Sequence, residues 1–156
     1  MSDQLGFEVE LPLEFNAATD AVRAALKTEG FGILTEIDLR STFREKLGRE
    51  FRRFTILGAC NPPLAFAAVT ADPTVGLLLP FNVTVEENAP GRSLVRLVDP
   101  QMMLSAAPGG LSSALREVAV DARARMERVV RELNRVGAAA TPVGTGNPQA
   151  VHQADM

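Results

Sequence analysis

The chain has 156 residues, of which 46% are hydrophobic and 22% are charged, a mixture typical of folded globular proteins. The 19 acidic and 16 basic side chains give a net charge of -3, which argues against a general nucleic-acid binder. No apolar run is long enough to span a membrane, and the first residues lack the basic and apolar regions of a secretory signal. A single cysteine excludes an internal disulfide, so we expect a cytoplasmic protein.

The residues that are missing from the chain exclude several kinds of chemistry. The one histidine, His152, stands near the C-terminus, so a Ser-His-Asp or Cys-His site in the body of the chain is excluded. A zinc site built from histidine and cysteine is excluded for the same reason, because Cys60 is the only other such ligand, and we predict no metal. The chain contains neither a Walker phosphate loop nor a dinucleotide-binding glycine motif, and it indicates no particular cofactor.

The N-terminal half alternates between strand and helix patterns. Alternating apolar and polar residues predict strands at residues 7–13, 31–39 and 51–58. Asn16 is a good N-cap for a helix, because its side-chain oxygen can accept hydrogen bonds from the free backbone N–H groups. The helix is expected to end at Gly30, because glycine readily adopts the left-handed conformation found there. Ser41 is the predicted cap of a short helix over residues 42–47, with Gly48 at its end.

The middle of the chain predicts one helix followed by a hairpin. Asn61 stands near the N-cap of a helix at residues 64–71, and the two prolines after it suit a first helical turn. The segment 75–86 is rich in valine and leucine, which predicts a fourth strand with a bend at Pro80. A turn then leads to a fifth strand at residues 92–98, so the pair is expected to form a hairpin.

The last predicted element is a long amphipathic helix. From Leu111 to Val136 the apolar residues recur every three or four positions, which predicts about seven helical turns. We therefore predict one α+β domain over residues 1–136, with a mainly antiparallel sheet, helices packed on one face and a flexible tail over residues 137–156. The helix is longer than a small sheet requires, which favours a partner subunit against its remaining length.

Several segments together resemble domain-of-unknown-function family 302. Their order and spacing carry the resemblance, which extends more loosely from Phe7 to about Val136. The segments are GFGILTEID (30–38), FREKLG (43–48), ILGACNPPLA (56–65), DP (72–73) and GLLLPFNV (76–83). The resemblance implies a compact α+β domain that commonly forms a homodimer, and it implies no activity. Members of that family often carry a second cysteine where this chain has Phe81, so a two-thiol mechanism does not carry over.

Cys60 is the leading candidate for chemistry. It falls between a predicted strand and a predicted helix, and the positive end of a helix dipole favours a thiolate. Such a thiolate could act as a nucleophile, a redox sensor or a ligand for a soft metal. The alternative is that Cys60 packs as a small hydrophobic residue, which is the commoner role of a free cysteine.

Five further residues are candidates for a site. Glu36 and Asp38 share a strand face, so these carboxylates could perform acid–base chemistry or bind a hard cation. The alternative is a solvated face, or a pairing with Arg53 on the neighbouring strand. Lys46 is one of two lysines in an arginine-rich chain and could hold an anion, although a surface position is the simpler interpretation. Asn61 and Asn82 each stand beside a proline-containing bend. Both are candidate ligand-binding residues or caps of local structure.

These residues support two functions from different classes. The first is a dimeric module that binds or senses a small ligand or sulfur species, with Cys60, Asn61, Asn82, Glu36 and Lys46 as candidate binding residues. The second is a thiol-dependent enzyme, for redox chemistry or sulfur transfer, with Cys60 as nucleophile and Glu36 or Lys46 assisting. The lack of a histidine base favours the binding module. A third interpretation, a purely structural partner protein, predicts an inert Cys60.

Overall fold

Five strands form one antiparallel sheet in the computed structural model, which describes residues 5–107 and 109–140. Helices lie between the strands in the chain and follow them, and the last helix is the longest element. The elements are β1 (Gly6–Leu11), α2 (Phe15–Thr28), β2 (Gly32–Asp38), α3 (Leu39–Leu47), β3 (Phe54–Cys60), α4 (Pro62–Ala71), the 3-10 helix η1 (Pro73–Leu78), β4 (Phe81–Ala89), β5 (Arg92–Val98), α5 (Pro100–Leu104) and α6 (Ser113–Ala140).

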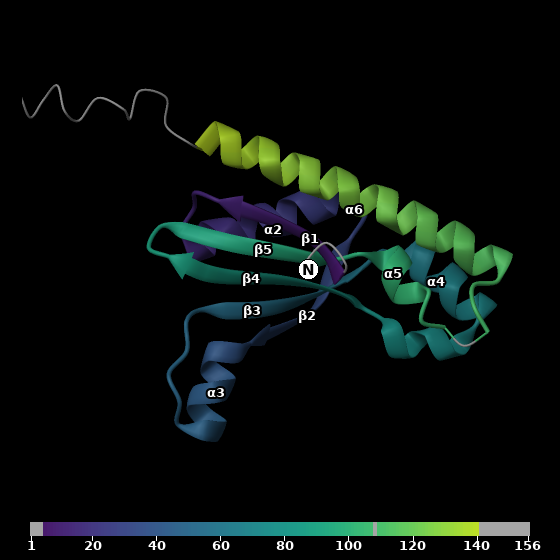
Figure 1. Cartoon of the computed structure of the whole chain (residues 1–156), viewed down its shortest axis with the longest axis horizontal. Helices are drawn as coiled ribbons and strands as arrows, with labels where there is room; N and C mark the ends of the chain where they lie inside the picture. The colour runs from purple at the N-terminus through teal and green to yellow at the C-terminus, as the bar shows by residue number, and fades with distance from the viewer. Residues whose placement is uncertain (1–4, 108, 141–156) are drawn as a thin grey trace, which may run out of the picture.

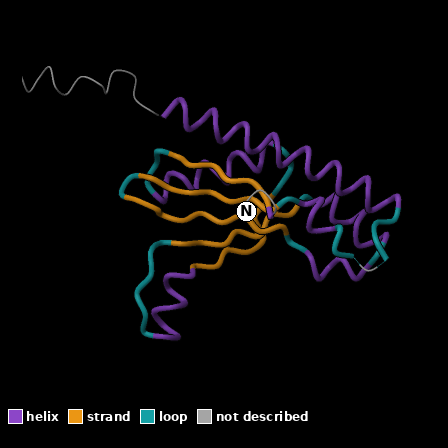
Figure 2. The backbone as a smooth tube through the Cα atoms, in the orientation of Figure 1, coloured by secondary structure: helices purple, strands orange, loops and turns teal. Residues whose placement is uncertain are grey.

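The strand order is β1-β5-β4-β3-β2, so the first strand of the chain lies at one edge and the second at the other. Helices α2 and α6 lie against one face of the sheet, and α3 projects away from the β2 edge (Figure 1). Helices α4 and α5 and the η1 turn gather at one end of the sheet (Figure 2). The predicted α+β class, with an antiparallel sheet and a long C-terminal helix, is confirmed.

Alternation along the strands decides which sheet face is buried. On β4, Val83 and Val85 are fully buried, and on β5 they are matched by the buried Val95 and Leu97. These side chains meet the apolar side of α2, where Val22 and Leu26 are also fully buried. The core therefore lies between the sheet and the helices, on the face that we call the helix face.

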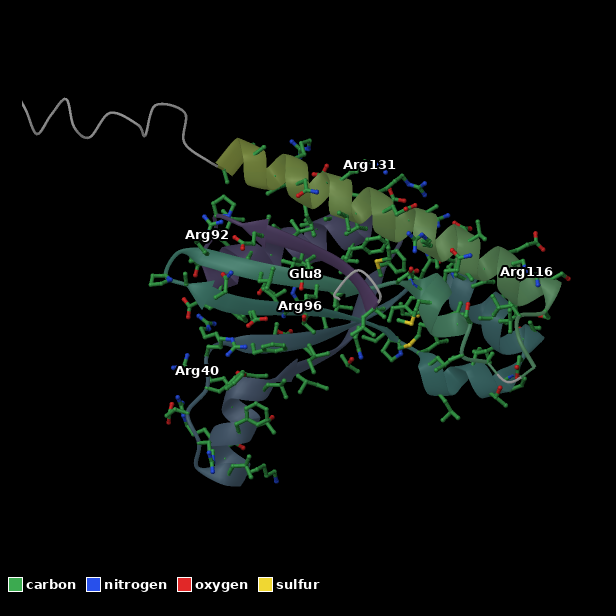
Figure 3. The ribbon with its side chains drawn as sticks, viewed as in Figure 1. Glu8, Arg40, Arg92, Arg96, Arg116 and Arg131 are labelled. Atoms are coloured by element: carbon green, nitrogen blue, oxygen red, sulfur yellow. The ribbon has the colours of Figure 1, made fainter. Side chains whose placement is uncertain are left out.

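The opposite face of the sheet, which we call the open face, carries a network of charges. Arg52 Nε lies 2.5 Å from Glu86 Oε2, and Arg96 bonds both Glu86 and, at 2.8 Å, Glu8. Figure 3 shows Glu8 and Arg96 side by side on the sheet. Burial by itself would raise the pKa of Glu86, but the hydrogen bonds from Arg52 and Arg96 outweigh it, so this pKa lies below its ordinary value.

Helix α6 is the central packing element outside the sheet. Its apolar residues, among them Leu115, Met126 and Leu133, are almost wholly buried, and the helix contacts β1, α2, α4 and α5. Most of its apolar face is therefore used within the chain, whereas Val120 is 52% exposed, so a partner subunit against part of this helix stays a prediction. The helix also continues to Ala140, beyond the predicted end at Val136. The rest of the predicted tail, with His152, lies outside the described residues.

Two helices begin at residues other than the predicted caps. Glu14, not Asn16, caps α2, because its carboxylate accepts hydrogen bonds from the backbone N–H groups of Asn16 and Ala17. Asp38, not Ser41, caps α3 by accepting from the N–H of Ser41 at 3.1 Å. A carboxylate is the stronger acceptor for such a donor, and it stands two residues before the predicted cap of α2 and three before that of α3. Gly48 ends α3 in the left-handed conformation, as predicted.

Two strand predictions are wrong in position. The third strand spans Phe54–Cys60 rather than 51–58, because Gly32 at the start of β2 pairs with Cys60 and extends the ladder to that residue. Residues 73–78 form the η1 turn rather than the start of a strand. There the carboxylate of Asp72 caps the backbone of Thr74 at 3.0 Å, and Pro73 suits a first helical position. This local capping outweighs the strand preference of valine and leucine.

Among the described residues, none of the helices combines the length with the apolar character that crossing a membrane requires. Even α6, the longest, carries charged side chains along its exposed sides. The predicted hairpin of β4 and β5 is confirmed, with Gly91 in the left-handed conformation at its turn.

Candidate functional site

The junction between β3 and α4 is built around Asn61. Its Oδ1 accepts the backbone N–H of Leu64 at 3.3 Å, and its Nδ2 donates to the carbonyl of Glu29 at 3.2 Å. The side chain therefore caps α4, as predicted, and also ties the end of α2 to the start of α4. Gly30 permits this contact, because a Cβ on that glycine would stand 2.9 Å from Asn61 Nδ2. The amide is thus engaged in structure at both of its polar atoms.

Cys60 is the last residue of β3 and is half-buried. Burial raises the pKa of its thiol above the ordinary value, which is the opposite of the direction expected for a helix N-terminus. The sequence supplies the reason. Pro62 and Pro63 occupy the first two helical positions and have no N–H, and Asn61 already accepts the next one. Few donors are left there to stabilise a thiolate.

The face on which Cys60 lies also differs from the prediction. Side chains alternate across a strand, so the predicted strand at residues 51–58 has Phe54, Ile56 and Gly58 on one side, and Cys60 is expected to follow them on that apolar side. The buried side chains of β3 are instead those of Thr55, Leu57 and Ala59, which belong to the helix face. Cys60 lies at the end of the strand, where the sheet gives way to α4 and the segment before β4.

A pocket of about 250 Å³ opens at Cys60. It lies at the end of the sheet, between α4, α6 and the segment that joins η1 to β4. Its lining is almost entirely apolar, and it includes no charged side chain. The lining residues are Leu34, Ala59, Cys60, Asn61, Leu64, Ala65, Ala68, Leu79, Pro80, Phe81 and Val118.

A close approach of two segments shapes this pocket. A Cβ on Gly58 would stand 2.7 Å from Pro80 Cγ and closer still to the Thr35 hydroxyl, so only glycine fits between them. Because Gly58 has no side chain, Pro80 can lie against β3 beside the pocket. The same position explains why a glycine interrupts an otherwise apolar strand.

Exposed apolar side chains surround this end of the molecule. Phe66 of α4 is 75% exposed, Leu77 of η1 is 89% exposed and Leu34 of β2 is 67% exposed. Helix α4 contains no charged residue, yet only Ala68 among its residues is buried. We call the exposed apolar side chains Leu34, Phe66 and Leu77 the α4 surface. Leu34 also lines the pocket, and α4 supplies further residues to its lining.

The other predicted site residues lie elsewhere. Glu36 and Asp38 do share a face of β2, but Glu36 pairs with Arg23 of α2 rather than with Arg53, and Asp38 is the cap of α3. Both line a separate polar cleft. Asn82 lies on a groove of the open face, and Lys46 stands exposed on α3. Of the five predicted binding residues, the structure brings together only Cys60 and Asn61.

The residues that form most of the pocket wall were not among the sequence candidates. Leu64, Ala65 and Ala68 carry no chemistry, and Val118 comes from a helix far along the chain. The helical spacing of Leu64, Ala65 and Ala68 was the available signal, but it indicates an apolar face without showing whether that face is filled. In the part of the chain that the structure describes, no group of three or more histidine, cysteine, aspartate or glutamate residues is placed to hold a metal ion.

Comparison with known proteins gives two findings. Residues 7–133 match the family described as Domain of unknown function DUF302. A solved structure, titled crystal structure of uncharacterized conserved protein DUF302 from Bacillus stearothermophilus, is similar to this chain. It shows 27% sequence identity and a TM-score of 0.71, and the similarity covers 83% of this chain and 98% of that one. None of the curated proteins matches. The predicted resemblance is confirmed, and the chain belongs to the DUF302 family.

Proposed function

We propose that this protein is a binding module for a small, mainly apolar molecule, which it holds in the pocket at Cys60. The observation that carries the proposal is the pocket itself, a recess of about 250 Å³ whose walls are almost wholly apolar. Binding sites for small molecules are concave and mainly apolar, with few polar groups. A cavity of about 150 Å³ can hold benzene, so this pocket suits a ligand of roughly ten non-hydrogen atoms.

The same lining favours binding over catalysis. An enzyme that used Cys60 as nucleophile would need a base beside it, or a lowered thiol pKa. The pocket lining contains no acidic or basic side chain, and burial raises the pKa of Cys60. Glu36, the proposed assistant, lines a different cavity, and Lys46 belongs to neither lining. The thiol-dependent enzyme is therefore the weaker alternative.

We also propose that the module is a homodimer that buries the α4 surface. Phe66 and Leu77 are large apolar side chains with most of their area exposed, and such patches are typical of interaction sites. A second copy at this surface would lie next to the pocket and could cover part of its mouth.

We retain the prediction of a cytoplasmic location, which rests on the single cysteine.

The test of ligand binding uses indole, an apolar molecule of the right size, and two variants of α4. Ala65→Phe places a ring in the pocket, whereas Ala67→Phe adds the same ring at an exposed position that is absent from the lining. Titration followed by NMR should give saturable binding to the unmodified protein, with a Kd below about 1 mM. Ala65→Phe should weaken binding at least about tenfold, and Ala67→Phe should leave it unchanged.

Thermal unfolding of both variants controls for damage to the fold. If indole does not bind, or if the two variants reduce binding equally while remaining folded, the pocket is not the site and the proposal is wrong.

A further inference from the structure

A second cavity, separate from the pocket at Cys60, lies between α2, the start of α3 and the start of β3. It is a cleft of about 700 Å³ with mainly polar walls. Four arginines line it, which is a quarter of the 16 basic residues in the chain: Arg23, Arg40, Arg44 and Arg53. Figure 3 shows Arg40 near the start of α3.

The four arginines differ in their partners. Arg23 pairs with Glu36, and Arg44 Nη2 lies 2.9 Å from Glu50 Oε1. Arg40 and Arg53 form no ion pair among the described residues, although they lie in the same cleft. Glu50 illustrates the difference, since its pKa is lowered first by the hydrogen bond from Arg44 and only last by the charge of Arg40.

Arg40 is half-buried, and Arg53 is held by contacts within the fold. The Nε atom of Arg40 is buried and has no hydrogen-bond partner among the described residues, an arrangement that costs free energy unless an acceptor reaches it. The guanidinium of Arg53 lies 4.2 Å from the centre of the Phe15 ring, and its Nη2 donates to Asn16 Oδ1 at 2.8 Å. Stacking on one face leaves the edge of the guanidinium to bind a further acceptor.

The carboxylates of the cleft do not satisfy these two arginines. Glu36 is engaged by Arg23, and Asp38 accepts the N–H of Ser41 as the cap of α3. Asp20 completes the acidic lining and forms no ion pair among the described residues. The cleft therefore presents two guanidinium groups without an ion-pair partner, one of which has a buried N–H with no acceptor.

We propose that this cleft binds a small molecule through its oxyanion, a phosphate or carboxylate group that Arg40 and Arg53 hold between them. Guanidinium groups present N–H donors in a planar fork that matches the oxygens of both anions. Phe15 and Phe54 also line the cleft and supply apolar contact for the remainder of the molecule. The site is independent of the proposed apolar pocket.

The test titrates the full chain with inorganic phosphate and with succinate at constant ionic strength, followed by calorimetry. At least one anion should bind with a Kd of about 10 mM or lower. Arg40→Gln and Arg53→Gln should each weaken that binding about tenfold, as the loss of a hydrogen bond to a charged group does. Arg131→Gln is the matched control, because Arg131 is exposed on α6 outside the cleft.

The titrations with phosphate and with succinate distinguish the two kinds of anion that the cleft could bind. Binding of phosphate alone assigns a phosphate group, and binding of succinate alone assigns a carboxylate. Failure of both anions to bind overturns the proposal. So does an equal loss in Arg131→Gln, because that result would show that arginines outside this cleft attract the anion equally well. Circular dichroism in a buffer without phosphate or succinate verifies that each variant is folded.

Discussion

Glu86 shows how one buried charge is accommodated on the open face of the sheet. Only 5% of its side chain is exposed, and Arg52 and Arg96 bind its two oxygens. Glu86→Gln would leave both arginines without their shared anion, so we expect the free energy of unfolding to fall by about 2 kcal/mol. Chemical denaturation measures this, with Glu87→Gln as the control. Glu87 neighbours Glu86 but forms no ion pair among the described residues.

The lowered pKa of Glu86 also predicts a dependence on acid. A carboxyl group whose pKa is lower in the folded state stabilises the protein above its unfolded pKa, and the stabilisation is lost as the pH falls through the folded pKa. Unfolding free energies should therefore decrease below about pH 4.5, and Glu86→Gln should reduce that decrease. An identical slope in the variant would show that other carboxyl groups account for the acid sensitivity.

Cys60 gives the opposite prediction at alkaline pH. Because burial raises its pKa, alkylation by iodoacetamide should reach half of its maximal rate above the ordinary cysteine value of about 8.5. The denatured chain provides the reference, and the signal has one source because no other thiol exists. A native midpoint below that of the denatured chain would restore the reactive thiolate and, with it, the enzyme alternative.

At the scale of elements, Asn61 joins α2 to α4. Asn61→Ala removes the cap of α4 and leaves the carbonyl of Glu29 without this donor, so we expect a loss of about 2 kcal/mol in unfolding free energy. Asn61→Asp keeps the acceptor for the N–H of Leu64 but not the donor to Glu29. Its unfolding free energy should therefore lie between those of the unmodified protein and Asn61→Ala. If Asn61→Ala unfolds like the unmodified protein, the junction does not depend on this side chain.

Short-range signals predicted the elements well where one side chain decides the local structure. The cap at Asn61, the stop at Gly48 and the hairpin of β4 and β5 all follow from such signals. Predictions failed where a nearby stronger group competes, as Glu14 does with Asn16. They also failed where pairing with another strand sets the boundary, as Gly32 does for Cys60.

The candidate sites were harder to predict than the fold, because residues distant in sequence form them. Cys60 and Asn61 adjoin in the chain and share the pocket, but Val118 reaches it only through the packing of α6. Glu36 forms its ion pair with Arg23 instead of Arg53, because α2 packs against that face of β2. Sequence patterns indicate which face of an element is apolar, but not which cavity remains between elements.

At the scale of the whole molecule, the interface of the proposed dimer could be the α4 surface or the exposed side of α6. The replacement Phe66→Asp puts a charge on the α4 surface, whereas Val120→Asp puts one on the exposed side of α6, where Val120 is 52% exposed. Analytical ultracentrifugation should find a dimer for the unmodified chain and for Val120→Asp, and a monomer for Phe66→Asp. If the unmodified chain is a monomer, the proposed dimer does not form. If Val120→Asp dissociates the dimer and Phe66→Asp does not, the α4 surface is not its interface.

The central claim, an apolar ligand pocket at Cys60, is tested most directly by the alkylation rate of that cysteine in the presence of indole. Cys60 forms part of the pocket wall, so a bound ligand should shield its sulfur. At about pH 8 the rate should fall with increasing indole to a plateau, with a midpoint equal to the Kd from NMR titration. A rate that stays constant at indole concentrations that saturate the protein would contradict the claim.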